Sequence, residues 1–311
     1  MAMRKSFVDD NHYTLTNYTQ QQILGMWKTY HNQHNLHKLS PWRRGASLAV
    51  PYLLPKNKDI MKQRPIVPYS KHPLSKILNM VSRSIMFMLK NENVKSFTAF
   101  KVQDFVSNVD QVNRFLSHNP DKVVFARSGD VKNMYTELPH TVIKDALRWI
   151  LDLSLKKNRS RFFTIRKEGR DGVRPGRLST HFRWSDRNQR TFVEMDVDQI
   201  YDVAVFDLEN CFYLIGGQVY QQTVGIPMGS PLSPALAILI CAYYEHRFLT
   251  TFHTHESVHM FPSRYMDDLN MFVVLPLEMA HRVTQIWNLL TGIYHEDMEL
   301  ESEEVEFQFN F

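Results

Sequence analysis

Cysteine is scarce in this sequence, where Cys211 and Cys241 are the only two among 311 residues. Two cysteines build neither a disulfide framework nor a cysteine-rich metal site, so the pattern favours an intracellular, reducing compartment. Long hydrophobic runs are also missing, because the longest apolar stretch, residues 235–244, is too short to cross a bilayer. No apolar segment follows the charged residues 1–5, so we expect neither a signal peptide nor a membrane partner.

Internal repeats and low-complexity linkers are absent as well. Hydrophobic residues make up 43% of the chain and charged residues 22%, which are ordinary globular values and exclude a mainly disordered protein. A chain of this length can bury a core large enough for two or three sub-domains.

Charge is unevenly distributed along the chain. The first 100 residues hold 15 of the 37 Lys and Arg but four of the 32 acids, which leaves 22 bases and 28 acids for the rest. A second basic stretch covers residues 156–190, and residues 296–306 are acidic. A basic surface near an acidic one suits a polyanion held close to a metal site. Ordinary solvated faces would give the same pattern, so charge alone does not decide between them.

Apolar periodicity predicts the main elements. Apolar residues spaced by three or four positions predict helices at residues 20–31, 73–89, 140–155, 234–248 and 278–290. Strand patterns predict a strand at 122–126, a hairpin at 213–223 turning at Gly216-Gly217, and a hairpin at 260–275 turning at Asp267-Asp268. Residues 41–69 are expected to form extended strands and turns, and residues 169–190 a basic loop or ribbon.

Three segments carry candidate chemistry, and they are residues 124–135, 225–234 and 264–269. In the first, an apolar strand ends at Asp130, with an aromatic ring following at Tyr135. In the second, glycines precede a predicted helix, which allows a backbone to approach a ligand closely. The third places Asp267 and Asp268 at the tip of the predicted hairpin. Each segment taken alone is more simply explained as a turn or a cap. A functional prediction is therefore based on the joint order and spacing of the three segments.

Together the segments suit nucleotidyl transfer. Two divalent ions must bridge an attacking hydroxyl and a leaving pyrophosphate, which requires carboxylates from separate strands to converge. Mg²⁺ binds a few carboxylates together with phosphates and waters. We therefore expect Asp130 and Asp267 to face the metals, and Asp268 to contribute because the turn reorients it.

These segments resemble motifs A, B and C of reverse transcriptases, with Tyr265-Met266-Asp267-Asp268 matching the Y-x-D-D box. The wording is closest to Penelope-like retroelements, which share the stretch from Asp130 to His140 and the G-x-P-M-G-S-P-L-S-P of residues 225–234. Upstream, residues 55–58 and 64–67 resemble the fingers motifs. The resemblance covers about residues 51–275, and we recognise no family in the first forty residues.

The resemblance implies an α+β, right-hand polymerase of fingers and palm, whose antiparallel palm sheet is backed by helices. It implies RNA-directed DNA synthesis from an RNA template, a DNA primer and dNTPs, with two Mg²⁺ ions or alternatively Mn²⁺. The implied metal ligands are Asp130, Asp267 and Asp268. The implied dNTP-binding residues are Arg64, Lys56, Lys62, Tyr135, Gly229 and Ser230, with Tyr135 as the gate that rejects a 2′-hydroxyl.

The same resemblance suggests a division of the chain. The expected segments are an N-terminal extension (1–40), a first fingers segment (41–120), a palm strand with motif A (121–139), a fingers insertion with the basic ribbon (140–222), and a palm with motifs B and C (223–311). Residue 311 lies about where a primer grip and thumb should begin, so we expect the chain to end before them.

Several features depart from the pattern or compete with it. Met228 stands where many relatives have Gln, and no lysine lies in residues 291–311, where some polymerases place a general acid. Gly292-Ile293-Tyr294 matches part of a GIY-YIG nuclease motif, which we interpret as coincidence. Two histidine clusters, at residues 31–37 and 253–259, lack a neighbouring cysteine, so structural histidines are favoured over zinc ligands. The remaining alternatives are a catalytically silent nucleic-acid-binding domain and an RNA-dependent RNA polymerase.

Overall fold

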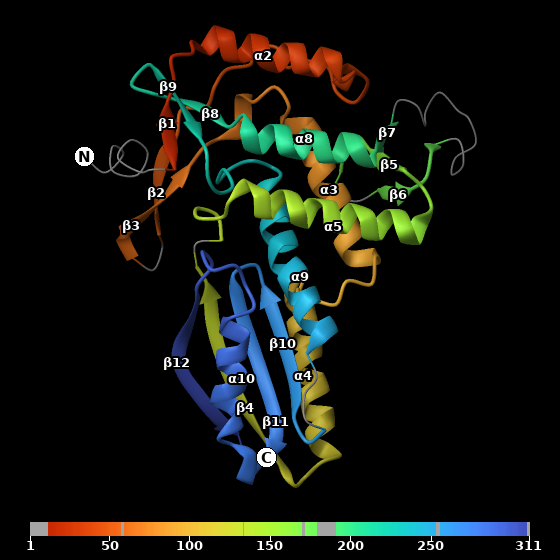
Figure 1. Cartoon of the computed structure of the whole chain (residues 1–311), viewed down its shortest axis with the longest axis vertical. Coiled ribbons are helices and arrows are strands. Elements are labelled where there is room, and N and C mark those ends of the chain that lie inside the picture. Colours follow the sequence, from red (N-terminus) through yellow and green to blue (C-terminus); the bar gives the residue numbers. More distant parts are fainter. Residues whose placement is uncertain are drawn as a thin grey trace. The chain divides into compact units, whose positions relative to one another are not determined.

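The structure is a computed structural model that describes residues 12–56, 59–132, 134–169, 172–178, 191–252 and 256–309 (Figure 1). Its α-helices are α2 (Gln20–Gln33), α3 (Ser75–Asn91), α4 (Val102–Ser117), α5 (His140–Asn158), α8 (Val197–Glu209), α9 (Ser233–Thr251) and α10 (Arg282–Thr291). Its strands are β1 (Tyr13–Leu15), β2 (Tyr52–Lys56), β3 (Asp59–Ile66), β4 (Lys122–Val131), β5 (Phe162–Arg166), β6 (Val173–Pro175), β7 (Phe192–Asp196), β8 (Phe212–Ile215), β9 (Gln218–Gln222), β10 (His259–Tyr265), β11 (Asp268–Pro276) and β12 (Leu300–Phe309). The predicted mixed α+β fold with antiparallel sheets is confirmed.

The chain forms two compact units. The first unit combines residues 1–93 with 135–239, and the second combines residues 94–134 with 240–311. The chain therefore passes from one unit to the other three times, the last time within α9.

The second unit is built on a four-stranded antiparallel sheet with the order β10-β11-β4-β12. After α4, its elements follow along the chain as β4, α9, β10, β11, α10 and β12, which is the β-α-β-β-α-β pattern of a split βαβ fold. Helix α4 packs against β10, β11 and β4, and Val112, Val124 and Val274 form the buried centre of that contact. Helix α10 packs against the opposite face, where Trp287 lies against Gly129. Both faces of the sheet are thus partly covered.

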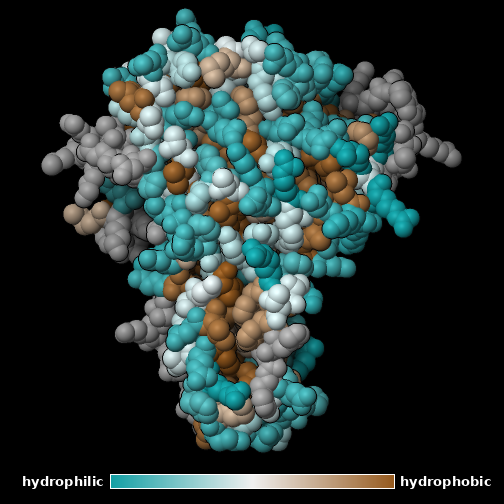
Figure 2. All heavy atoms as spheres, viewed as in Figure 1, coloured by the Kyte–Doolittle hydropathy of each residue, from teal (hydrophilic) through white to brown (hydrophobic). Residues whose placement is uncertain are grey.

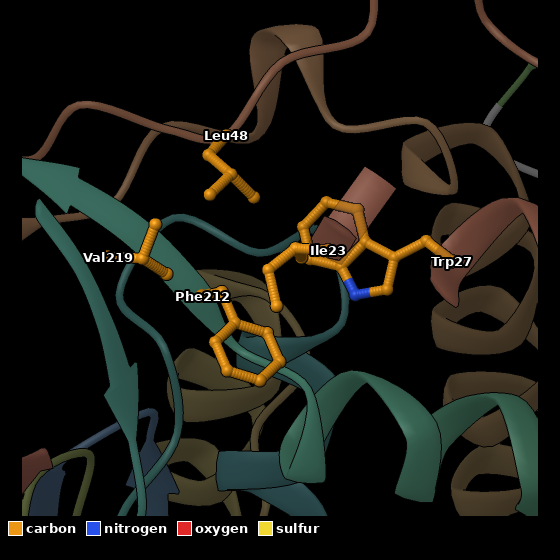
Figure 3. Packing of buried hydrophobic residues seen from close by; sticks show 5 residues of the cluster. All are labelled: Ile23, Trp27, Leu48, Phe212 and Val219. Carbon is orange, nitrogen blue, oxygen red and sulfur yellow. The ribbon is translucent and has the colours of Figure 1, made fainter. Parts of the chain in front are cut away.

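Three helices, α3, α5 and α8, pack against one another in the first unit. Three small sheets accompany them, with the strand orders β1-β9-β8, β2-β3 and β6-β5-β7. Helix α2 begins at a capping box in which Thr19 and Gln22 satisfy each other's backbone N–H groups. Its buried residues Ile23 and Trp27, four positions apart, point toward β8 and β9 (Figure 3).

The visible surface and the lengths of the helices bear on the expectation that no segment crosses a membrane. Hydrophilic residues cover most of the visible face (Figure 2). Within the part of the chain that the structure describes, no helix combines the length and the apolar character needed to cross a membrane.

All five predicted helices are present, with ends shifted by up to four residues at either end. The hairpin at Gly216-Gly217 is also confirmed. The expected turn at Asp267-Asp268 is wrong by one residue, because Tyr265 pairs with Asp268 and the turn residues are Met266 and Asp267. Helices α4 and α8 were not predicted. The acidic end contains β12, whose strand character depends on its pairing with β4.

Candidate active site in the four-stranded sheet

Asp130 and Asp268 lie directly opposite each other on the neighbouring antiparallel strands β4 and β11. Opposed residues of an antiparallel pair point to the same face, with Cβ atoms about 4.5–5.5 Å apart. The sequence predicts that Asp130 and Asp267 face the metals and that Asp268 contributes through the turn, whereas the register makes Asp268 the direct neighbour of Asp130. Two carboxylates from distant parts of the chain therefore share one face of the sheet.

Asp267 occupies the second position of the tight turn that joins β10 to β11. The first position, Met266, has a φ of 57°, while Asp267 is not among the residues with positive φ. Such a φ at the first central residue is the feature of turns that match the twist of a hairpin. The carbonyl of Asp267 accepts a hydrogen bond of 2.8 Å from the N–H of Val131. The turn is thereby attached to the end of β4, next to Asp130.

The face that carries Asp130 and Asp268 changes character along the strands. Toward one end, Val124, Phe272 and Val274 lie under α4 in an apolar cluster. Toward the other end, the register continues through Ser128 opposite Asn270 to Asp130 opposite Asp268. Asp130 is half-buried and Asp268 is exposed. At the polar end of the face, Asp268 is therefore accessible to solvent and Asp130 is accessible in part.

Glu301 extends this row onto the edge strand, because it lies opposite Asp130 on β12. It forms an ion pair with Lys132, which compensates its charge. In the sequence, Glu301 is distinguished only as part of the acidic end of the chain. The usable signal for the strand was farther along, where Glu304, Glu306 and Gln308 alternate with Val305, Phe307 and Phe309.

The donor chemistry fits divalent magnesium. Carboxylate oxygens from Asp130 and Asp268, with Asp267 in the adjoining turn, are the ligands that Mg²⁺ uses together with waters and phosphates. Among the described residues, no three His, Cys, Asp or Glu side chains are gathered closely enough to enclose a metal by themselves. Asp130, Asp267 and Asp268 therefore do not form such a group in the part of the chain that the structure describes.

In the first unit, the loop with Gly229 and Ser230 is held against the segment that follows β3. The N–H of Val67 donates to the carbonyl of Met228 over 2.7 Å. Gly229 has a φ of 126°, and a Cβ atom there would lie 2.3 Å from the carbonyl oxygen of Val67. Only glycine permits this close approach.

A buried carboxyl group that the sequence analysis missed lies beneath the same loop. Ser230 donates a hydrogen bond of 2.8 Å to Asp207 of α8. Burial raises the pKa of Asp207 to about 7, although hydrogen bonds from Ser230 and Tyr69 act in the opposite direction. No local pattern distinguishes Asp207 from the other acids of α8, since its burial arises from tertiary packing.

The remaining dNTP-site candidates also belong to the first unit. Tyr135 is half-buried, and its carbonyl accepts a hydrogen bond of 2.7 Å from Ile226 at the start of the glycine loop. A Cβ atom at Gly225 would lie 2.5 Å from that carbonyl oxygen. Arg64 is exposed on β3, opposite Leu54 on β2. The side chains of Lys56 and Lys62 lie outside the described residues.

The histidine clusters, the GIY tripeptide and the basic ribbon are described in part by the structure. His31 is buried, with Nε2 3.0 Å from the carbonyl oxygen of Ser40, whereas His253 and His255 lie outside the described residues. Tyr294 of the GIY tripeptide is buried and donates to Glu245. The basic ribbon is described in part, and there Arg177 lies over the ring of Phe162 at 4.1 Å. Residues 170, 171 and 179–190 of the ribbon are not described.

Comparison of the fold with solved structures identifies telomerases. The telomerase of Candida tropicalis, in complex with a TWJ fragment of telomeric RNA, matches at 13% identity and a TM-score of 0.56, over 91% of this chain and 45% of that one. The corresponding complex from Candida albicans matches at 13% identity and a TM-score of 0.57, over 93% of this chain and 47% of that one. Apo telomerase of Candida tropicalis matches at 12% identity and a TM-score of 0.57, over 92% of this chain and 48% of that one.

This likeness shows that the chain has a right-hand polymerase-like fold. The chain spans about half the length of the telomerase chains that it matches. By sequence, no protein-family description and no curated protein matches it.

Proposed function

We propose that the chain is the fingers and palm of an RNA-directed DNA polymerase, which extends the 3′-hydroxyl of a primer with dNTPs on an RNA template. The observation that carries the proposal is the register of Asp130 against Asp268 at an open, polar end of the sheet. The polymerase-like fold adds support, and so does the resemblance of the three segments to motifs A, B and C of reverse transcriptases. The motif wording further suggests a Penelope-like retroelement as the source.

In the proposed site, Asp130, Asp267 and Asp268 hold two Mg²⁺ ions, with Mn²⁺ as the alternative. When bound, the ions would activate the primer hydroxyl and neutralise charge on the leaving pyrophosphate. The primer oxygen forms a bond to the α-phosphorus as the bond to the bridging oxygen of pyrophosphate breaks, and the hydroxyl proton passes to water. The carboxylates contribute by positioning, which is the main source of catalysis in phosphoryl transfer.

The first unit would bind the nucleotide. Arg64 presents a planar guanidinium that suits the triphosphate, and Lys56 and Lys62 add point charges. Tyr135 would lie under the sugar, where its ring leaves no room for a 2′-hydroxyl. Gly229 and Ser230 would shape the pocket, because the close approach at Val67 keeps their loop in one conformation.

The experiment is primer extension on poly(rA) with an oligo(dT) primer, using the wild-type chain, Asp130→Asn and Asp268→Asn. We expect both variants to lose extension while keeping the wild-type melting temperature to within a few degrees. A suitable control is Asp198→Asn, which alters an exposed carboxylate paired with Arg161 in the first unit.

The outcomes separate the alternatives. Extension by Asp130→Asn at the wild-type rate would contradict the metal-site assignment. If the wild-type chain binds primer–template with a strong salt dependence but incorporates nothing, the chain is a silent nucleic-acid-binding domain. Preferential incorporation of NTPs would instead indicate an RNA-dependent RNA polymerase.

A further inference from the structure

Arg264, two residues before the Met266-Asp267 turn, is fully buried. Arg264 lies at the end of β10 with 0% of its surface exposed. Its guanidinium donates to the carbonyl of Met266 at 2.5 Å and to the hydroxyl of Thr98 at 2.9 Å. It also donates to both carboxylate oxygens of Glu245 on α9, over 2.5 and 3.2 Å. All of these groups belong to the second unit.

Glu245 is buried as completely as its partner. Besides Arg264, it accepts hydrogen bonds of 2.9 Å from the backbone N–H of Phe97 and from the hydroxyl of Tyr294. The backbone of Arg264 is attached to the same segment, because its N–H donates to Phe97 and its carbonyl accepts from Ala99. The ion pair is therefore fully hydrogen-bonded, as a buried charge must be.

Stability alone gives a weak reason for such a pair. Replacing a buried ion pair by apolar residues of similar volume is often neutral or stabilising, since desolvation offsets the attraction between the charges. An arginine at this position can donate to the carbonyl of Met266 in the turn, which an apolar residue cannot do.

The carbonyl of Met266 belongs to the peptide unit in the middle of the turn, so its orientation sets the orientation of that peptide. A peptide unit is planar, so holding the carbonyl of Met266 also holds the N–H of Asp267 and restricts the rotation between the two residues. Met266 has a φ of 57°, a conformation that costs a non-glycine residue about 1 kcal/mol. The bond from Arg264 stabilises this conformation from inside the unit, while the bond from Val131 to Asp267 holds the next carbonyl.

We propose that Arg264, oriented by Glu245, is a positioning residue that fixes the Met266–Asp267 peptide and thereby the metal affinity of the carboxylate site. The inference rests on the proposed function for the identity of the ligand, a divalent cation. The arginine touches neither substrate nor metal. It acts through the backbone of the turn.

The test uses the full chain with the double substitution Arg264→Met, Glu245→Gln. Glutamine keeps one acceptor oxygen for the N–H of Phe97, and its amide N–H can donate to the hydroxyl of Tyr294. No buried charge is left without a partner. The matched control is Arg127→Met, which removes another guanidinium from the same sheet, one that donates to Thr284 on the face opposite Asp130. A second variant, Arg264→Lys, keeps the charge but not the planar fork.

Three measurements are needed: Mn²⁺ affinity from the free-ion signal in electron paramagnetic resonance, hydrogen exchange of the Val131 N–H and the turn amides, and primer extension with Mg²⁺ and dNTP titrated separately. We expect the double variant to lose about tenfold in Mn²⁺ affinity and to exchange the turn amides at least about tenfold faster, as expected for coupling of about 1.4 kcal/mol. The dNTP KM should change less than twofold. Arg127→Met should resemble the wild type, and Arg264→Lys should lie between.

The proposal would be overturned if the double variant folds and both its Mn²⁺ affinity and the hydrogen-exchange rates of its turn amides stay within twofold of the wild-type values. So would faster exchange spread evenly over the second unit, because that would assign the pair to general stability. If the wild-type chain extends no primer, the proposed function fails, but turn exchange and Mn²⁺ affinity still decide the role of Arg264.

Discussion

The hydroxyl group of Ser230 donates a hydrogen bond to the carboxyl group of Asp207, which is 3% exposed beneath the glycine loop. Gly229, next to Ser230, is in contact with the backbone of Val67, so the loop is held on two sides. Because burial raises the pKa of Asp207 to about 7, this contact depends on pH near neutrality.

The first prediction concerns Asp207→Asn. The pKa of Asp207 rises from 3.8 to about 7 on folding, so the folded state binds the proton more tightly. The resulting stability is complete below pH 4 and is lost as the pH rises toward 7, at roughly 1.4 kcal/mol per pH unit. Asparagine cannot ionise and still accepts from Ser230. Its stability, measured by urea unfolding between pH 4 and 8, should lack this decline.

The comparison for this prediction is Asp198→Asn, which removes an exposed carboxylate from the same helix. Its stability should follow the wild-type pH dependence. Parallel curves for the wild type and Asp207→Asn would show that Asp207 titrates normally in the folded protein.

A second prediction concerns Gly229→Ala. Its Cβ atom would lie 2.3 Å from the carbonyl oxygen of Val67, and its φ of 126° is also unfavourable for alanine. Gly217→Ala provides the control, because Gly217 has a φ of 84° but no atom within 4 Å of a new Cβ. We expect Gly217→Ala to cost about 1–3 kcal/mol in unfolding free energy, and Gly229→Ala clearly more. Equal losses would mean that the contact with Val67 is easily relaxed.

The third prediction separates the carboxylates in the row across the sheet. Asp268 and Glu301 lie on either side of Asp130, but Glu301 is paired with Lys132. Asp268→Asn should lower the rate of primer extension by about a hundredfold or more, as loss of an electrostatic contact to a transition state does. Glu301→Gln should have a much smaller effect. Extension rates at saturating Mg²⁺ decide this, and equal losses would assign Glu301 to the metal site.

The fourth prediction concerns the sugar gate. Tyr135→Val removes the ring that is proposed to exclude a 2′-hydroxyl, so the ratio of kcat/KM for dTTP to that for UTP should fall by about tenfold or more. Tyr135→Phe keeps the ring and should keep the selectivity. Single-nucleotide incorporation on an RNA template measures both. If Tyr135→Val discriminates like the wild type, another residue must provide the gate.

Local patterns in the sequence were sufficient for the elements that carry the site. The strand ending at Asp130, the hairpin with Asp267 and Asp268, and the helix after Ser230 all follow from periodicity and turn residues within about twenty positions. Alternation of apolar and polar residues is a local property, so a single chain segment displays it.

Tertiary structure alone decided which of these residues meet. That Asp268 rather than Asp267 lies opposite Asp130 depends on the register between strands 138 positions apart, and register is set by which side chains the two faces can bury. Arg264 and Asp207 show no local sign of burial, because a buried charge is tolerated only where distant segments supply its hydrogen bonds. Composition and periodicity determined most of the elements, though not α4, α8 or β12, and the types of residue available. Packing determined their partners, because desolvation is a property of the folded chain.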